Sequence, residues 1–174
     1  SVAVHALRRG GEISGKKVLV LGAGTIGNLV GQSARAMGAA DVMVTDISEY
    51  KLEMAGRVGL NHAVQTQQEE LSKAIIRVFG PDKADLILEC VGAQDTITQA
   101  VANARKGSTL VVVGVFGKKP VVDLGLVQDR ELNVLGTLMY QKTDYEKAIE
   151  LVASDRVPLN HLIPHRFPLD QSLT

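Results

Sequence analysis

The chain has 174 residues, which is enough for one domain with a substantial core, and its composition marks no second one. Lys plus Arg and Asp plus Glu number 19 each, so no surplus of positive charge exists to neutralise nucleic-acid phosphates or an anionic membrane. The chain has no Trp and few other aromatic residues, which leaves little for stacking on single-stranded bases. We therefore expect neither a nucleic-acid nor a membrane partner.

Cysteine content and apolar run length limit the protein further. Cys90 is the single cysteine, which excludes an internal disulfide and a cysteine-rich zinc cluster. The longest apolar run, around TLVVVGVFG, is too short to cross a bilayer. The opening SVAVHALRRG lacks the layout of a secretory signal. These features predict a soluble protein in the cytoplasm.

Short runs rich in Val, Ile and Leu alternate with longer stretches of helical spacing. Several of these runs, such as KVLVLG and ADLILEC, are apolar at consecutive positions, as in parallel strands covered on both faces. The pattern predicts an α/β fold, a doubly wound parallel sheet of about six strands with helices on both faces, known as the Rossmann fold. In chain order we expect the end of a helix over VAVHALRR, a strand near 17–21, a helix near 25–38, a strand near 41–45, a helix near 49–57, a strand near 62–64, a helix near 67–78, a strand near 84–89, a helix near 94–104, strands near 108–114 and 132–138, and a helix near 144–153.

The two ends do not fit this alternation. The first helix looks as if it begins upstream of Ser1, and the proline-containing finish stops where a new helix opens after Asp170. The sequence therefore predicts one domain over 1–174, with termini, about 1–10 and 164–174, that look cut rather than natural.

Three glycines stand where the first predicted strand runs into a helix, in the spacing Gly22-x-Gly24-x-x-Gly27. In such a motif the first glycine allows a sharp turn, the second lets a pyrophosphate approach the main chain, and the third lets helix and strand pack closely. The helix N-terminus then offers amides and partial positive charge to the phosphates. A glycine-rich turn without a ligand is the alternative for the bare motif.

An acidic residue supplies the context. Asp46 ends the second predicted strand 19 residues after Gly27, where a carboxylate meets the 2′ and 3′ hydroxyls of an adenine ribose and repels a 2′-phosphate. This predicts NAD rather than NADP. Asp46 could instead begin a turn or cap the next helix, but Ser48 is the better cap, which leaves Asp46 free. Enzymes that use S-adenosylmethionine share the glycine turn and the acid, but generally do not need the third glycine.

The chain resembles the coenzyme domain of the medium-chain dehydrogenase/reductase family, in particular its zinc-dependent alcohol, polyol and threonine dehydrogenase branch. The resemblance covers nearly the whole sequence with matching spacing. Its blocks are SVAVHALRR, GKKVLVLGAGTIGNLVGQSARAMGA, VMVTDISEYKLEMAGRVG, ADLILECVG, GSTLVVVGV, ELNVLGT and HRFPLDQS.

Residue by residue, the resemblance implies that the main chain of Gly24, Thr25 and Ile26 faces the pyrophosphate and the nicotinamide ribose, and that Ile26 also presses on the nicotinamide. It implies that Asp46 holds the adenine ribose and that Lys51 reaches the same sugar. A solvated lysine on a helix face is the alternative for Lys51.

The resemblance also implies residues from the second half of the chain. Cys90 and Val91 line the adenosine and ribose region, although a small core side chain is the alternative for Cys90, which we expect to be neither catalytic nor a metal ligand. Main-chain groups of Val113, Gly114 and Val115 meet the nicotinamide carboxamide. Thr137 and Met139 complete that pocket.

The resemblance implies that residues 1–174 form one NAD(P)-binding Rossmann domain, which is dinucleotide-binding and whose termini, about 1–10 and 164–174, join a separate catalytic domain. In this branch that catalytic domain binds the zinc. The four histidines, His5, His62, His161 and His165, have neither ligand spacing on one helix nor a neighbouring cysteine. We therefore expect no catalytic and no metal-binding residue in this chain. His165 could shuttle protons near neutral pH, but its segment resembles a strand that returns to the catalytic domain, which favours surface or interdomain packing.

The resemblance predicts the NAD-binding domain of a zinc-dependent dehydrogenase that oxidises a secondary alcohol or polyol by hydride transfer to NAD, inactive as a fragment. Its partners are NAD(H), the alcohol or polyol, and a second copy of the chain, since the segment ELNVLGTLMY is expected at a sheet edge that pairs between subunits. Two alternatives are a nucleotide-sensing module without catalysis and a zinc-free NADPH-dependent quinone or enoyl reductase. Asp46 argues against the latter.

Overall fold

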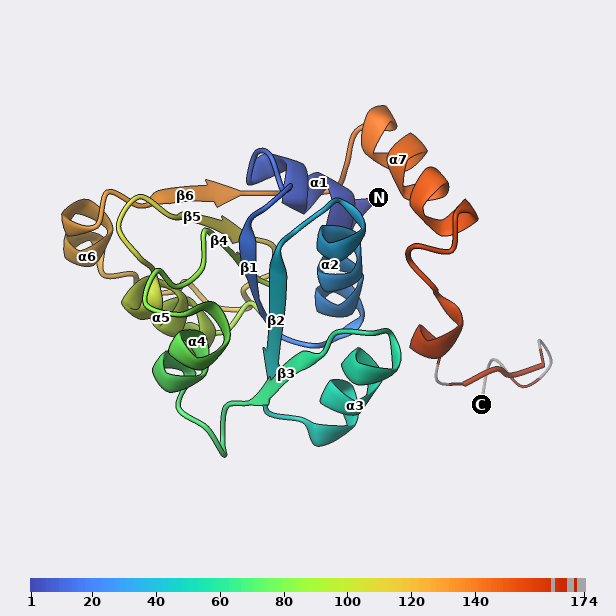
Figure 1. Ribbon diagram of the computed structural model, residues 1–174, viewed down its shortest axis with the longest axis horizontal. Helices are drawn as coiled ribbons and strands as arrows, with labels where there is room; N and C mark the ends of the chain where they lie inside the picture. Colours follow the sequence, from blue (N-terminus) through green and yellow to red (C-terminus); the bar gives the residue numbers. More distant parts are fainter. Residues whose placement is uncertain (164, 169–170, 172–174) are drawn as a thin grey trace.

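The computed structural model describes residues 1–163, 165–168 and 171. Its centre is a six-stranded parallel sheet in the order β3-β2-β1-β4-β5-β6 (Figure 1). The predicted doubly wound fold is therefore confirmed, with β6 at one edge as expected. The strands are β1 (Lys17–Leu21), β2 (Asp41–Asp46), β3 (His62–Gln65), β4 (Leu86–Glu89), β5 (Thr109–Val112) and β6 (Asn133–Gly136).

Helices cover both faces of the sheet (Figure 1). On one side lie α1 (Val2–Arg9), α2 (Thr25–Ala36) and α3 (Glu49–Arg57), and on the other α4 (Leu71–Phe79), α5 (Gln94–Asn103) and α6 (Leu124–Asp129). Because side chains alternate along a strand, Val18 and Val20 enter one core while Leu19 and Leu21 enter the other. This double burial explains why the central strands are apolar at consecutive positions.

Several boundaries differ from the sequence prediction. The fifth strand ends at Val112 rather than 114, because the amides of Val113 and Gly114 both turn to the carbonyl of Glu89, each at 2.8 Å. α4 begins at Leu71 rather than 67, after a turn in which Gln68 and Glu69 donate to the carbonyl of Gln65. The strands expected near 84–89 and 132–138 are Leu86–Glu89 and Asn133–Gly136, and α2 stops at Ala36.

One helix was not predicted, since no helix was expected between 114 and 132. α6 has six residues and buries none of them completely, although Leu126 and Val127 pack against the core. A helix of less than two turns is too short to show a helical period in the sequence. Its start is marked by Asp123, whose side chain accepts a hydrogen bond from the amide of Leu126 at 3.0 Å.

Helix α7 (Lys142–Ala153) is attached to α1 rather than to the sheet. Asp144 is 1% exposed and accepts hydrogen bonds from His5 Nδ1 at 2.7 Å, Arg8 Nη1 at 2.9 Å and the amide of Gln141 at 2.8 Å. Burial alone would raise the pKa of Asp144, but the hydrogen bonds from the Gln141 amide and from His5, together with the nearby charge of Arg8, outweigh it and lower that pKa. A short 3-10 turn, Asn160–Leu162, follows.

The C-terminal expectations are tested only in part. Residues 165–168 form no strand, and His165 is exposed with its ring 6.0 Å from that of Phe167, centroid to centroid. The helix expected after Asp170 lies outside the described residues, apart from the single position 171. Among the described residues, no helix has the length and apolar character needed to span a membrane.

Candidate cofactor site

The site forms at the carboxyl ends of β1, β2 and β4. Strands β2 and β3 follow on one side of β1 and β4 to β6 on its other side, so this is the point where the order of strands in the sheet changes direction. The glycine turn follows β1. Gly22 has φ +100°, a value that favours glycine, and its amide donates to the carbonyl of Thr45 on the neighbouring strand at 2.8 Å. The sharp turn expected of the first glycine is therefore present.

The other two glycines differ in what surrounds them. A Cβ on Gly27 would lie 1.7 Å from the carbonyl oxygen of Gly22, so the third glycine is required for close contact between helix and strand. A Cβ on Gly31, one turn later, would lie 2.7 Å from the side-chain atom Cδ1 of Leu60. A Cβ on Gly24 would meet nothing within 4 Å. Packing therefore explains Gly27 but not Gly24, whose open face fits the close approach of a ligand.

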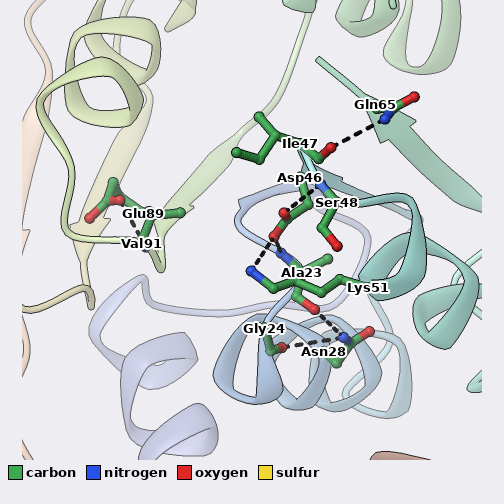
Figure 2. A network of polar contacts seen from close by, with 10 residues as sticks. All are labelled: Ala23, Gly24, Asn28, Asp46, Ile47, Ser48, Lys51, Gln65, Glu89 and Val91. Carbon is green, nitrogen blue, oxygen red and sulfur yellow. Dashed lines mark hydrogen bonds and ion pairs between the residues drawn. The ribbon is translucent and has the colours of Figure 1, made fainter. Parts of the chain in front are cut away.

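Gly24 is also the N-cap of α2, and within the described residues no side chain caps this helix end. The first-turn amides and the positive end of the helix dipole therefore remain for an anion. Asn28 supports the turn from below: its Nδ2 donates to the carbonyls of Ala23, at 2.5 Å, and Gly24, at 3.2 Å (Figure 2).

Asp46 ends β2 beside this turn (Figure 2). Its Oδ2 accepts hydrogen bonds from the amide of Ala23 at 2.8 Å and from Lys51 Nζ at 3.4 Å, and its Oδ1 accepts one from the amide of Ser48 at 2.9 Å. The residue is 9% exposed. The prediction that Asp46 is left free is therefore wrong.

The prediction that Ser48 caps the next helix with its side chain is wrong as well. Ser48 occupies the N-cap position of α3 but makes no side-chain cap hydrogen bond within the described chain, and its amide binds Asp46 instead. Acceptor-only carboxylate oxygens can each take more than one hydrogen bond, so Asp46 retains lone pairs for a ligand.

A cavity of about 360 Å³ opens beside these groups. Six of the residues predicted to bind the coenzyme line this cavity together: Gly22, Gly24, Asp46, Lys51, Cys90 and Val91. An adjoining hollow of about 260 Å³ is lined by Thr25, Asn28 and Lys51 among others. The structure thus brings the glycine turn, the acid and the end of β4 around one concave space of the size that holds small molecules.

Cys90 and Val91 follow β4 at the wall of this cavity. Val91 is 46% exposed, whereas Cys90 is partly buried and packs against the core that lies under α2. Burial, and then the charge of Glu89, raises the pKa of the Cys90 thiol well above its usual range. Cys90 is therefore a neutral thiol at pH 7, in agreement with its interpretation as a small packing residue.

Glu89 was not predicted as a site residue from the sequence. This carboxylate is fully buried at the end of β4, and its Oε1 accepts hydrogen bonds from the amides of Val91 at 2.9 Å and Gly92 at 2.8 Å and from Thr96 Oγ1 at 2.7 Å (Figure 2 draws the first of these). Its main-chain carbonyl holds the segment after β5, as described above. A charged residue at the end of the apolar run DLILE was the signal that could have indicated it.

Residues predicted for the nicotinamide end lie after β5 and β6. Val113, Gly114 and Thr137 are half-buried, while Val115 is 85% and Met139 61% exposed. A Cβ on Gly114 would lie 2.1 Å from the amide nitrogen of Gly92, so the segments after β4 and β5 touch. Ile26, also half-buried, packs against the core at the start of α2. These residues share the carboxyl edge of the sheet with the cavity but do not line it.

Among the described residues, no group of three or more His, Cys, Asp or Glu side chains is arranged to hold a metal ion. His5 is bound to Asp144, and His62 lies 3.9 Å from Asp41 at the other end of the sheet from the glycine turn.

Comparison with known proteins agrees with this geometry. Residues 25–154 match the family model described as zinc-binding dehydrogenase. The chain is 38% identical to sorbitol dehydrogenase from Bos taurus over 176 aligned residues, which cover 99% of this chain and 49% of that protein. The chain thus spans about half the length of the curated relatives it matches.

Two solved structures extend the likeness to three dimensions. Galactitol-1-phosphate dehydrogenase from Escherichia coli superimposes with a TM-score of 0.82 at 29% identity, over 91% of this chain and 48% of that one. A zinc-binding dehydrogenase from Sinorhizobium meliloti with bound NADP superimposes with a TM-score of 0.81 at 30% identity, over 90% and 47%. The chain belongs to the zinc-binding dehydrogenase family.

Proposed function

We propose that the chain is the NAD-binding domain of a zinc-dependent medium-chain dehydrogenase that oxidises a secondary alcohol or a polyol to a ketone. One observation carries this proposal: Asp46 and the unobstructed Gly24 line the same cavity at the carboxyl edge of the sheet. An acid at this position accepts hydrogen bonds from ribose hydroxyls, and an open glycine at a helix N-terminus admits a pyrophosphate.

In this proposal the chain binds and orients the coenzyme along the edge of the sheet. The amides at the start of α2 hold the pyrophosphate, while Asp46 and Lys51 hold the adenine ribose. Cys90 and Val91 wall the adenosine region through packing. Ile26 lies against the nicotinamide. The carboxamide of the nicotinamide meets main-chain groups of Val113, Gly114 and Val115. Thr137 and Met139 complete this pocket. When bound, NAD supplies the hydride acceptor.

Specificity for NAD over NADP rests on charge. A 2′-phosphate on the adenine ribose would bring negative charge next to the Asp46 carboxylate, which is 6% exposed and poorly screened. Lys51 Nζ, at 3.4 Å from Oδ2, is itself 48% exposed and neutralises that charge only in part. The solved structure from Sinorhizobium meliloti holds NADP, so the fold by itself does not exclude NADP, and the proposed preference for NAD rests on Asp46.

The rest of the reaction belongs to groups outside this chain. We propose that zinc and the substrate-binding side chains lie in a second, catalytic domain, joined at about 1–10 and 164–174, and that the 174-residue chain alone does not turn over. A soluble, cytoplasmic homo-oligomer is proposed as well. The oligomeric part of this proposal is supported by β6, an edge strand on which Val134 is 43% exposed and after which Leu138 is 81% exposed.

The two alternative functions have less support. Similarity to a sorbitol dehydrogenase over 99% of the chain favours an enzyme domain over a free-standing sensing module. The position of Asp46 in the cavity disfavours an NADPH-dependent reductase.

Titration of the 174-residue chain with NADH and NADPH, followed by the change in coenzyme fluorescence, tests the proposal. We expect saturable binding of NADH and at least tenfold weaker binding of NADPH. Equal affinities would contradict the role given to Asp46, and no NADH binding at millimolar coenzyme would contradict the function itself.

A further inference from the structure

A second cavity, of about 520 Å³, lies at the opposite ends of the helices that border the coenzyme site. It is formed by the C-terminal half of α2, the C-terminal end of α3 and the turn that follows α7. The glycine turn stands at the N-terminus of α2, so the two cavities are separated by the length of that helix. None of the residues predicted for the coenzyme lines this second cavity.

Gln32 lines this cavity and is 2% exposed. Neither its Nε2 nor its Oε1 has a hydrogen-bond partner among the described residues. An amide side chain buried in this way is unfavourable unless something pairs with it, and native structures contain few such groups. Because both atoms are fully buried, the side chain would have to turn toward the cavity to pair with its contents.

Three arginines share the same lining: Arg35, Arg57 and Arg156. Asp155 is the one carboxylate among the lining residues, so the cavity carries a formal surplus of two positive charges. The existing contacts of the arginines use few of their donors. Arg35 donates from Nη1 to the carbonyl of Gly59, and Arg57 Nη2 lies 3.9 Å from Glu53 Oε2 with both side chains more than half exposed. A guanidinium has five N–H donors, so most remain for a ligand.

We propose that this cavity is a binding site for a phosphate group, either free phosphate or the phosphate of a small ester. Guanidinium groups match the geometry of phosphate oxygens with paired hydrogen bonds. A phosphate at neutral pH carries about two negative charges, which balance the formal positive surplus of the lining side chains. In this proposal the amide of Gln32 turns toward the cavity and donates to an oxygen at its floor. A volume of about 520 Å³ exceeds the need of a lone phosphate and leaves space for an organic remainder.

The test follows the Gln32 side-chain amide by NMR in the ¹⁵N-labelled chain, with the signal assigned from a Gln32→Met variant. Inorganic phosphate is titrated at neutral pH, with sodium chloride adjusted to keep the ionic strength constant. A parallel titration uses glycerol 3-phosphate. We expect saturable shifts of the Gln32 amide signal in both, and the ligand that binds more tightly identifies the source of the phosphate.

Two variants on the rim, Arg57→Gln and Arg156→Gln, should weaken phosphate binding at least tenfold while the fold is kept, since both side chains are exposed. Arg77→Gln is the matched control, because Arg77 is similarly exposed, pairs with Glu69 on another face and does not line the cavity. It removes the same charge and should leave the affinity unchanged.

Three results would overturn the proposal: shifts at Gln32 that do not saturate, equal weakening by the control, or phosphate-induced shifts confined to Gly24 and Thr25 at the coenzyme site. NADH titration of the same variants separates this proposal from the coenzyme function. Arg57→Gln and Arg156→Gln should keep the parent affinity for NADH, whichever way the phosphate result falls.

Discussion

The carboxylate of Asp46 accepts a hydrogen bond from the main-chain amide of Ala23, with Oδ2 2.8 Å from that nitrogen. The acid that is proposed to recognise the ribose therefore also fixes the turn that is proposed to recognise the pyrophosphate. Each half of the site depends on the other, because moving the end of β2 would move the glycine turn with it.

Asp46→Asn should weaken NADH binding about tenfold to hundredfold, since a hydrogen bond to a charged group contributes roughly 1.5–3 kcal/mol. The amide oxygen of Asn can still accept from Ala23, so the turn should persist. The affinity of the variant for NADPH should equal or exceed that of the parent chain. Fluorescence titration measures both affinities, and Asp41→Asn, at the other end of the same strand, is the control that should change neither.

Two glycine substitutions should separate folding from binding. Gly27→Ala places a Cβ 1.7 Å from the carbonyl of Gly22 and should destabilise the fold by about 3 kcal/mol or more. Gly24→Ala meets no atom of the chain within 4 Å, and its φ of −66° suits alanine, so its stability should equal that of the parent. Its methyl group would nevertheless occupy the space assigned to the pyrophosphate.

Urea unfolding and NADH titration of both variants make the comparison. A Gly24→Ala variant that binds NADH at parent affinity would show that the coenzyme does not approach this residue.

Removal of Glu89 should loosen the wall of the site. In Glu89→Ala, the amides of Val91 and Gly92 and the hydroxyl of Thr96 lose their common acceptor, which should cost about 3 kcal/mol of unfolding free energy. Glu89→Gln keeps one acceptor oxygen for these donors and should be clearly less damaging. Urea denaturation checks the order of the two variants, and equal stabilities would refute the role given to Oε1.

Docking of α7 onto α1 should depend on pH through Asp144. Because the pKa of Asp144 is lowered in the folded chain, its contribution to stability is present above the ordinary aspartate value of about 3.9 and is lost as the pH falls through the lower, folded value. Asp144→Asn should therefore be destabilised at pH 7, by about 3 kcal/mol. The gap to the parent should shrink below about pH 4. Thermal unfolding between pH 3 and 7 measures this gap, and a gap independent of pH would contradict the assignment.

The sequence predicted the central part of the fold well because the strands β1, β2 and β4 are buried on both faces and read as continuous apolar runs. It failed at α6, which is less than two turns long and therefore too short to show a helical period. It also predicted Asp46 as free and Ser48 as a side-chain cap. Local capping preference favoured that reading, but an amide from a turn 23 residues earlier competes for the same carboxylate.

Glu89 and Gln32 were not predicted from the sequence either. Their importance comes from what surrounds them, namely two loop amides and a threonine in one case, and three arginines from three different segments in the other. Spacing along the chain cannot reveal such neighbours. By contrast, the three glycines of the turn are close in sequence, so their pattern was readable directly.

The parallel arrangement of all six strands has a consequence for how such a domain changes over time. The loops that follow the strands all lie at the carboxyl edge of the sheet, which we call the rim. The hydrogen bonds between the strands lie in the sheet itself and not in these loops. Exposed rim positions such as Val115 and Met139 can accept new side chains without disturbing the ladder. One scaffold can thereby acquire different chemical preferences by surface replacement alone, except where a loop contact such as that of Gly27 with Gly22 forbids any added atom.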